Sequence, residues 1–144
     1  MTSTIYVLNG PNLNLLGFRE PEIYGTDTLD DIAGMLEDRA KELGVEVETY
    51  QSNHEGELID LMHHANAEGV KAIIINAGAY THTSIALLDA AKSIKVPVIE
   101  VHLSDPMKRE EFRHISYIGM AAVAEFKGMG PRGYILALDH AANL

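Results

Sequence analysis

The sequence contains no cysteine, and it has few basic residues and no long apolar run. The lack of cysteine excludes disulfides, thiolate nucleophiles, cysteine-ligated zinc and iron–sulfur clusters. Only 11 Lys and Arg stand against 21 Asp and Glu, so the formal net charge is -10. Because sequence-independent phosphate binding needs clustered Lys and Arg, we expect no nucleic-acid partner and no anionic membrane partner. No segment approaches the roughly 20 apolar residues that cross a bilayer, and no basic region precedes the first apolar run. We therefore expect a cytoplasmic protein.

The sequence does contain enough apolar material for one hydrophobic core. Hydrophobic residues make up 47% and charged residues 22% of the 144 residues, which is typical of a folded domain rather than a disordered chain. The length suits one domain and is too short for two full cores. We expect a single domain over residues 1–144.

Apolar residues alternate between strand-like runs and helix-like spacing along the chain. Thr26 or Thr28 is the expected N-cap of the first long helix, and Gly44 and Gly69 are expected helix ends. Regular strand–helix alternation implies a parallel sheet covered by helices on both faces. We predict an α/β fold, a flavodoxin-like three-layer sandwich around a five-stranded parallel sheet of order 2-1-3-4-5. The predicted strands are 5–8, 45–50, 72–75, 97–102 and 121–126, and the predicted helices are 29–43, 57–68, 85–91, 105–112 and 134–142.

Polar side chains follow the ends of three predicted strands. The first strand runs into Asn9, the third runs into Asn76, and the fourth ends with Glu100 and His102. In such a sheet, ligands bind beyond the carboxyl ends of the strands, near the point where strand order reverses. A single asparagine there is more often a turn residue. Three strands that bring polar groups to one edge favour a binding site.

Glu100 and His102 are two residues apart on a strand, so their side chains share one face. A carboxylate beside an imidazole fixes its tautomer and keeps a proton available near neutral pH, which suits a general acid. A core histidine satisfied by its glutamate neighbour is an equal alternative on spacing alone. The position of the pair at the end of the strand favours the functional interpretation.

The segment after the first strand carries Arg19 and Tyr24 and is long for a connection between a strand and a helix. Extended loops in compact domains often act as lids or binding loops. A tyrosine serves as a base near neutral pH only when a cation stabilises its phenolate, and Arg19 is a candidate for that cation. Loop packing for the tyrosine and a surface position for the arginine remain open on the residues alone.

Two further segments at this edge offer groups for an anion or a polyol. Residues 80–84 open the helix after the third strand with hydroxyls and amides, and Leu103 and Ser104 precede the next helix start. A structural N-cap cluster is the alternative, and both interpretations can hold.

Residues 128–133 match a dinucleotide-binding glycine pattern but leave no room for the strand and acidic residue that must follow, so a tight turn is expected.

Together these segments resemble the type II 3-dehydroquinate dehydratases over nearly the whole chain. The matching stretches are 8–17 (LNGPNLNLLG), 19–25 (REPEIYG), 51–56 (QSNHEG), 76–84 (NAGAYTHTS), 100–104 (EVHLS), 109–113 (REEFR) and 132–134 (RGY).

The resemblance implies conversion of 3-dehydroquinate to 3-dehydroshikimate and water by anti elimination through an enolate, with no metal or cofactor. It implies that Tyr24 removes the proton beside the ketone as tyrosinate, with Arg19 keeping it ionised. It places Asn12 at a water that supports the enolate oxygen, and it makes His102, oriented by Glu100, the acid that protonates the departing hydroxyl.

The same resemblance implies the substrate contacts and the assembly. Asp89 matches a position that reaches the site of a neighbouring subunit, which implies a homo-oligomer, in this family usually a dodecamer built from trimers. The implied substrate-binding residues are Asn76, His82 and Arg113 for the hydroxyls and the backbone of Leu103 and Ser104 for the carboxylate.

Two other functions remain alternatives. A different enolising lyase or isomerase that acts on a sugar phosphate would need a stronger phosphate cradle and a carboxylate base. A flavodoxin-like ligand-binding or regulatory module would need no catalytic groups at all.

Overall fold

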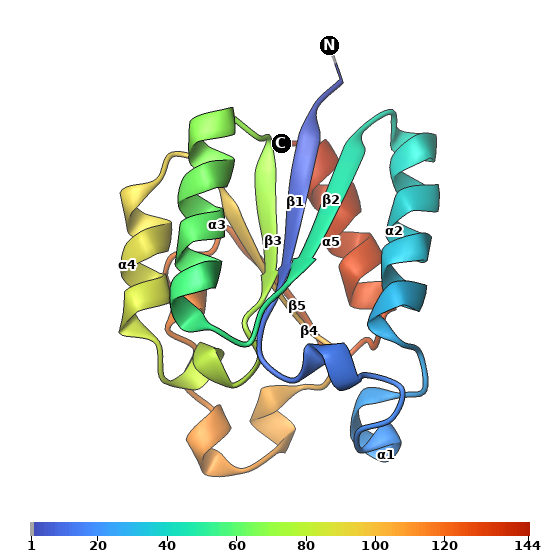
Figure 1. Ribbon diagram of the computed structural model, residues 1–144. Coiled ribbons are helices and arrows are strands. Elements are labelled where there is room, and N and C mark those ends of the chain that lie inside the picture. Colours follow the sequence, from blue (N-terminus) through green and yellow to red (C-terminus); the bar gives the residue numbers. More distant parts are fainter. Residues whose placement is uncertain (1) are drawn as a thin grey trace.

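The structure, a computed structural model, describes residues 2–144 as a five-stranded parallel sheet between two layers of helices (Figure 1). The strand order is β2-β1-β3-β4-β5, so the predicted topology is confirmed. The strands are β1 (Thr4–Asn9), β2 (Glu46–Gln51), β3 (Ala72–Asn76), β4 (Val98–His102) and β5 (Ala124–Lys127). The helices are α1 (Pro21–Tyr24), α2 (Leu29–Leu43), α3 (Glu55–Glu68), α4 (Ile85–Ser93) and α5 (Arg132–Ala142).

The two faces of the sheet carry separate halves of the core. Helices α2 and α5 cover one face, and α3 and α4 cover the other (Figure 1). Alternate residues of each strand enter opposite halves: in β3, Ile74 packs under α2 and α5, whereas Ile73 and Ile75 pack under α3 and α4. Strands β3 and β4 are buried along their full length, as central parallel strands should be, while β2 lies at the edge and is largely exposed.

Local signals fix the ends of the long helices. The Thr28 side chain accepts a hydrogen bond from the Asp31 N–H at 3.1 Å, and the Asp31 carboxylate accepts from the Thr28 N–H at 2.9 Å. This reciprocal capping box makes Thr28, rather than Thr26, the N-cap of α2. Gly44 and Gly69 adopt left-handed conformations at the ends of α2 and α3, as predicted.

The predicted helix over 105–112 is wrong. The segment instead forms two short 3₁₀ turns, η3 (Pro106–Lys108) and η4 (Glu111–Arg113), with Arg109 in an extended conformation between them. Asp105 caps η3 as expected, but this polar stretch has no apolar stripe that a longer helix could bury. Strand β5 also starts later than predicted, at Ala124, and residues 121–123 connect it to η5 (Ile118–Met120).

The tight turn predicted over 128–133 occupies residues 128–131, and Arg132 and Gly133 already belong to α5. Gly128 and Gly130 have φ values of +77° and +58°, a region that favours glycine. Their N–H groups donate to Ser104 O at 3.1 Å and to Leu103 O at 3.0 Å. The turn before α5 therefore holds the segment that follows β4.

Within residues 2–144, no helix has the length and apolar composition needed to span a bilayer.

Candidate active site

A cavity of about 80 Å³ lies beyond the carboxyl ends of β1, β3 and β4. Two of the predicted site residues are not part of its wall: Glu100 lies behind His102, and Asp89 is exposed on α4. The nine predicted residues that do line it are Asn12, Arg19, Tyr24, Asn76, His82, His102, Leu103, Ser104 and Arg113.

A wider hollow of about 760 Å³ lies elsewhere, near the starts of β1 and β3. Its wall includes the carboxylates of Glu48 and Glu68 and contains Lys71 but no arginine. The smaller cavity brings together three arginines and two histidines. Local positive charge attracts anions, so the smaller cavity is the better candidate for a site that binds a carboxylate-bearing substrate.

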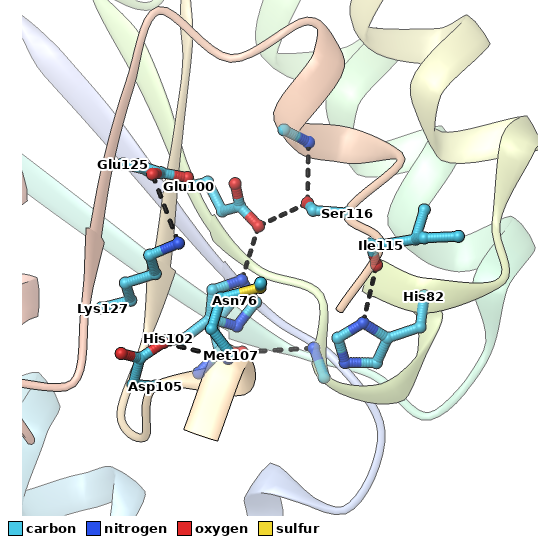
Figure 2. A network of polar contacts seen from close by, with 12 residues as sticks. Asn76, His82, Glu100, His102, Asp105, Met107, Ile115, Ser116, Glu125 and Lys127 are labelled. Carbon is cyan, nitrogen blue, oxygen red and sulfur yellow. Dashed lines mark hydrogen bonds and ion pairs between the residues drawn. The ribbon is translucent and has the colours of Figure 1, made fainter. Parts of the chain in front are cut away.

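The His102–Glu100 pair is buried and tightly coupled. His102 Nε2 lies 2.5 Å from Glu100 Oε2, which confirms that the two side chains share one face of β4. The Ser116 hydroxyl donates to the same carboxylate oxygen at 2.6 Å (Figure 2). Burial alone would raise the pKa of Glu100, but the hydrogen bonds from His102 and Ser116 and the nearby Lys127 ammonium lower that pKa below its usual value. An ionised Glu100 accepts the proton on Nε2, and no protein group within residues 2–144 pairs with Nδ1 of His102.

Sequence reasoning did not find the residues that support Glu100 from behind. The Gly119 N–H donates to Ser116 Oγ at 2.9 Å and so orients that hydroxyl. A Cβ at position 119 would lie 2.7 Å from Glu100 Oε1 and 2.8 Å from Ser116 Oγ. Only glycine therefore allows the η5 backbone to approach the carboxylate this closely. No local pattern connects a glycine and a serine in this segment to a glutamate on β4.

Tyr24 lies at the end of α1 with two guanidinium groups against its ring. The Cζ atoms of Arg19 and Arg109 are 4.6 Å and 5.1 Å from the ring centroid. The structure thus brings together the predicted Arg19–Tyr24 pair and adds Arg109, which was not predicted as a site residue. Arg109 also donates to Ser104 Oγ at 3.4 Å, and its extended backbone between η3 and η4 brings it to this side of the cavity. A continuous helix over 105–112, as predicted from the sequence, gave no reason to place Arg109 beside Tyr24.

Asn76 is held by a hydrogen-bond chain that continues through the core. Its Nδ2 donates to the Tyr134 hydroxyl at 3.0 Å, and its Oδ1 accepts from the Gly78 N–H at 3.2 Å. The Tyr134 hydroxyl in turn donates to Asn9 Oδ1 at 2.7 Å. The expectation that Asn9 joins the site is wrong, because its side chain shares the face of Ile5 and Val7 and points under α5. Asn9 instead fixes Tyr134, which fixes Asn76.

His82 lies on η2 (Gly78–His82) and contributes to the cavity wall. Its Nδ1 is 2.9 Å from the carbonyl oxygen of Ile115 (Figure 2). A carbonyl can only accept, so Nδ1 carries the hydrogen. Burial and the neighbouring charge of Arg113 lower the pKa of His82, which favours a neutral ring. A neutral ring with the hydrogen on Nδ1 leaves Nε2 as an acceptor for a hydroxyl.

Asn12 stands at the mouth of the cavity in a left-handed conformation, with φ of +69°. Its N–H donates to Asn53 Oδ1 at 3.0 Å, and Gln51 Nε2 donates to the same oxygen, also at 3.0 Å. Asparagine tolerates this backbone region better than most residues. The Asn12 side chain is exposed and free to contact a ligand or a water in the cavity.

Comparisons with known proteins agree closely over the whole chain. Residues 3–142 match the family model described as Dehydroquinase class II. The chain is 54% identical to the 3-dehydroquinate dehydratase of Corynebacterium glutamicum, covering 100% of this chain and 99% of that protein. It is 55% identical to the one of Caulobacter vibrioides, with coverage of 100% and 98%. The crystal structure of type II dehydroquinase from Butyrivibrio crossotus superposes with a TM-score of 0.95 at 45% identity, covering 97% of each chain.

Proposed function

Because the chain belongs to the class II dehydroquinase family, we propose that the cavity described above carries out the reaction of that family. The protein is a hydro-lyase, a type II 3-dehydroquinate dehydratase of the shikimate pathway. In this proposal, a single domain over residues 1–144 eliminates water from 3-dehydroquinate in the anti sense through an enolate. The product is 3-dehydroshikimate, and the reaction uses no metal or cofactor.

Tyr24 is the base in this mechanism. Its phenolate takes the proton from the carbon beside the ketone, and Arg19 and Arg109 stabilise the charged phenolate before the transfer. Two cations at one phenol support this role more strongly than one would. As the proton leaves, negative charge develops on the ketone oxygen, and a water held by Asn12 stabilises this enolate by hydrogen bonding.

His102 is the acid. Its imidazolium protonates the departing hydroxyl, which leaves as water while the enolate collapses to the conjugated ketone. Glu100 keeps Nε2 protonated and fixes the ring, so the unpaired Nδ1 is the nitrogen that faces the substrate. The proton taken by Tyr24 and the proton given by His102 balance, and the two groups exchange them through solvent after product release.

The remaining residues position a polyol that carries a carboxylate. The backbone of Leu103 and Ser104 holds the carboxylate, and the turn at Gly128 and Gly130 keeps that segment in place. The hydroxyls are held by Asn76, His82 and Arg113, of which His82 offers an acceptor nitrogen.

The assembly is a proposal from the resemblance. Asp89 is exposed on α4 and outside the cavity wall, so it can reach a site only in a neighbouring subunit. We therefore propose a homo-oligomer in the cytoplasm, a dodecamer built from trimers. Light scattering of the purified protein tests this, since one subunit is 15.8 kDa. A monomeric mass with full activity would contradict it.

The observation that carries the mechanism is that one cavity is lined both by a phenol with two guanidinium groups against its ring and by an imidazole paired with a buried carboxylate. Its test is the growth of ultraviolet absorbance from the conjugated product when purified protein meets 3-dehydroquinate. Tyr24→Phe should lower kcat by roughly a thousandfold while the fold is kept, because proton transfer by a positioned side chain is worth about that much. Tyr80→Phe is a matched control, since Tyr80 is outside the cavity wall and its hydroxyl bonds Asn53 O. Retained turnover in Tyr24→Phe would show that another group is the base.

A further inference from the structure

A second, smaller cavity lies directly behind His102. This rear cavity has a volume of about 30 Å³. It shares His82, His102, Pro106 and Arg113 with the wall of the substrate cavity, so His102 stands between the two spaces. The rest of its wall comes from Thr81, Glu100, Met107, His114, Ser116, Glu125 and Lys127.

Two buried polar atoms on residues of this wall have no hydrogen-bond partner within residues 2–144. They are Glu100 Oε1 and Thr81 Oγ1, on residues that are 1% and 0% exposed. Every other buried side-chain polar atom in the described chain is paired. An unpaired buried polar atom destabilises the folded protein, and it does so more strongly when it is charged. Two such atoms on residues of one cavity need a common explanation.

The rear cavity has the size and the chemistry of a water site. A water needs at least about 10–15 Å³ and two to four polar partners, so a space of about 30 Å³ accommodates one or two molecules. Glu100 Oε1 is an acceptor, and the Thr81 hydroxyl both donates and accepts. The ammonium of Lys127 pairs with Glu125 at 3.5 Å (Figure 2), and these two wall residues have partly exposed side chains.

We propose that the rear cavity binds an ordered water that donates to Glu100 Oε1 and is held by the Thr81 hydroxyl. This inference rests on the proposed roles of Glu100 and His102. With the water bound, Oε2 accepts from His102 and Ser116 while Oε1 accepts from the water, so both oxygens are fixed. A carboxylate fixed at both oxygens cannot rotate away from the imidazole. Thr81 is thereby a positioning residue for the acid, which it does not touch.

The substitution Thr81→Val gives opposite results for a wet and a dry cavity. Valine keeps the shape of threonine and removes the hydroxyl. If the cavity is dry, the change deletes an unpaired buried hydroxyl, and Tm should stay equal or rise. If the water is present, the change removes one of its anchors, and Tm at pH 7 should fall by about 3–6 °C. Thr81→Ser, which keeps the hydroxyl and loses the methyl group, is the matched control.

A crystal structure and enzyme kinetics complete the test. Electron density of the intact enzyme should show a water within hydrogen-bond distance of Glu100 Oε1 and Thr81 Oγ1. Density should weaken in Thr81→Val and remain in Thr81→Ser. Because Thr81 acts through His102 and not on the substrate, Thr81→Val should lower kcat several-fold with KM nearly unchanged, and Thr81→Ser should restore most of kcat.

An empty rear cavity in the intact enzyme, or a Thr81→Val variant at least as stable as the wild type, would overturn the proposal. A Thr81→Val variant with a raised KM and an unchanged kcat would also overturn the positioning role. The electron density of the water and the Tm are both measured without substrate, so they test the water site independently of the proposed mechanism. Absence of any dehydratase activity in the wild type would refute the mechanism and leave the water site standing.

Discussion

The Tyr134 hydroxyl is the centre of the buried chain that connects Asn9 to Asn76, and its removal is a sharp test of how the fold supports the site. Tyr134 is fully buried, and burial raises the pKa of its phenol, so the hydroxyl is neutral and can donate. It donates to Asn9 Oδ1 at 2.7 Å and accepts from Asn76 Nδ2 at 3.0 Å. Tyr134→Phe deletes one oxygen atom and leaves both amides without these partners.

The cost follows from the two groups left unpaired. Each buried polar group that loses its partner costs about 1–3 kcal/mol, and removal of the phenol's own desolvation offsets part of this. We therefore expect the free energy of unfolding to fall by about 2–4 kcal/mol, a large share of the roughly 5–15 kcal/mol that stabilises a typical domain. Asn76, released on one side, should also hold the substrate less well, and KM should rise.

Urea unfolding at a fixed protein concentration measures the first effect, and the midpoint should fall by about 1–2 M. Tyr117→Phe is the control, since Tyr117 is only partly buried and its hydroxyl makes no hydrogen bond within residues 2–144. A Tyr134→Phe variant as stable as this control, with unchanged KM, would refute the reasoning that the chain of amides positions Asn76.

Three further changes test the groups around the acid and the base. Arg109→Gln removes one cation from the ring of Tyr24, and kcat/KM in the absorbance assay should fall about tenfold to a hundredfold. Gly119→Ala places a methyl group 2.7 Å from Glu100 Oε1, and the unfolding free energy should fall by about 1–3 kcal/mol together with kcat. Ser116→Ala removes a hydrogen bond to ionised Glu100, and stability at pH 7 should fall by about 1.5–3 kcal/mol. Because the pKa of Glu100 is lowered in the folded state, its stabilisation is present above the unfolded pKa and is lost as pH falls. The Ser116→Ala deficit should therefore shrink below about pH 4 in unfolding experiments.

Each of these changes has a control within the chain. Arg109→Lys keeps the charge, so activity close to that of Arg109→Gln would show that shape rather than charge matters at Tyr24. Gly34 is an exposed position on α2 with open space around an added methyl group, so Gly34→Ala should leave stability unchanged or slightly higher. A Ser116→Ala deficit that is the same at about pH 3 as at pH 7 would show that the hydroxyl does not act through the charge of Glu100.

Short-range patterns predicted much of the fold and part of the site. The parallel sheet follows from the alternation of strand and helix periods, and five such strands fit the flavodoxin-like order that the structure has. The ends of α2 and α3 follow from Thr28, Gly44 and Gly69. The contact between Glu100 and His102 follows from the two-residue period of a strand. Each of these properties depends on residues near one another in sequence.

The errors concern segments that lack such a period. The cap at Asp105 correctly predicted a helical start, but no apolar stripe continues it, and the chain leaves the helix after one turn. Asn9 follows a strand end as Asn76 does, yet Asn9 is satisfied by Tyr134, 125 residues away. Turn chemistry at a strand end cannot reveal a partner supplied by the last helix.

The sequence by itself determined the parallel sheet, the edge at which its polar groups collect and the pairing of the carboxylate with the imidazole. Only the tertiary structure decided that Arg109 joins Tyr24, that Gly119 and Ser116 support Glu100, and that a space remains between Glu100 and Thr81. The physical reason is that backbone periodicity acts over a few residues, whereas close approach and cavities arise where elements distant in sequence pack together. The shape of that packing is a property of all the elements at once.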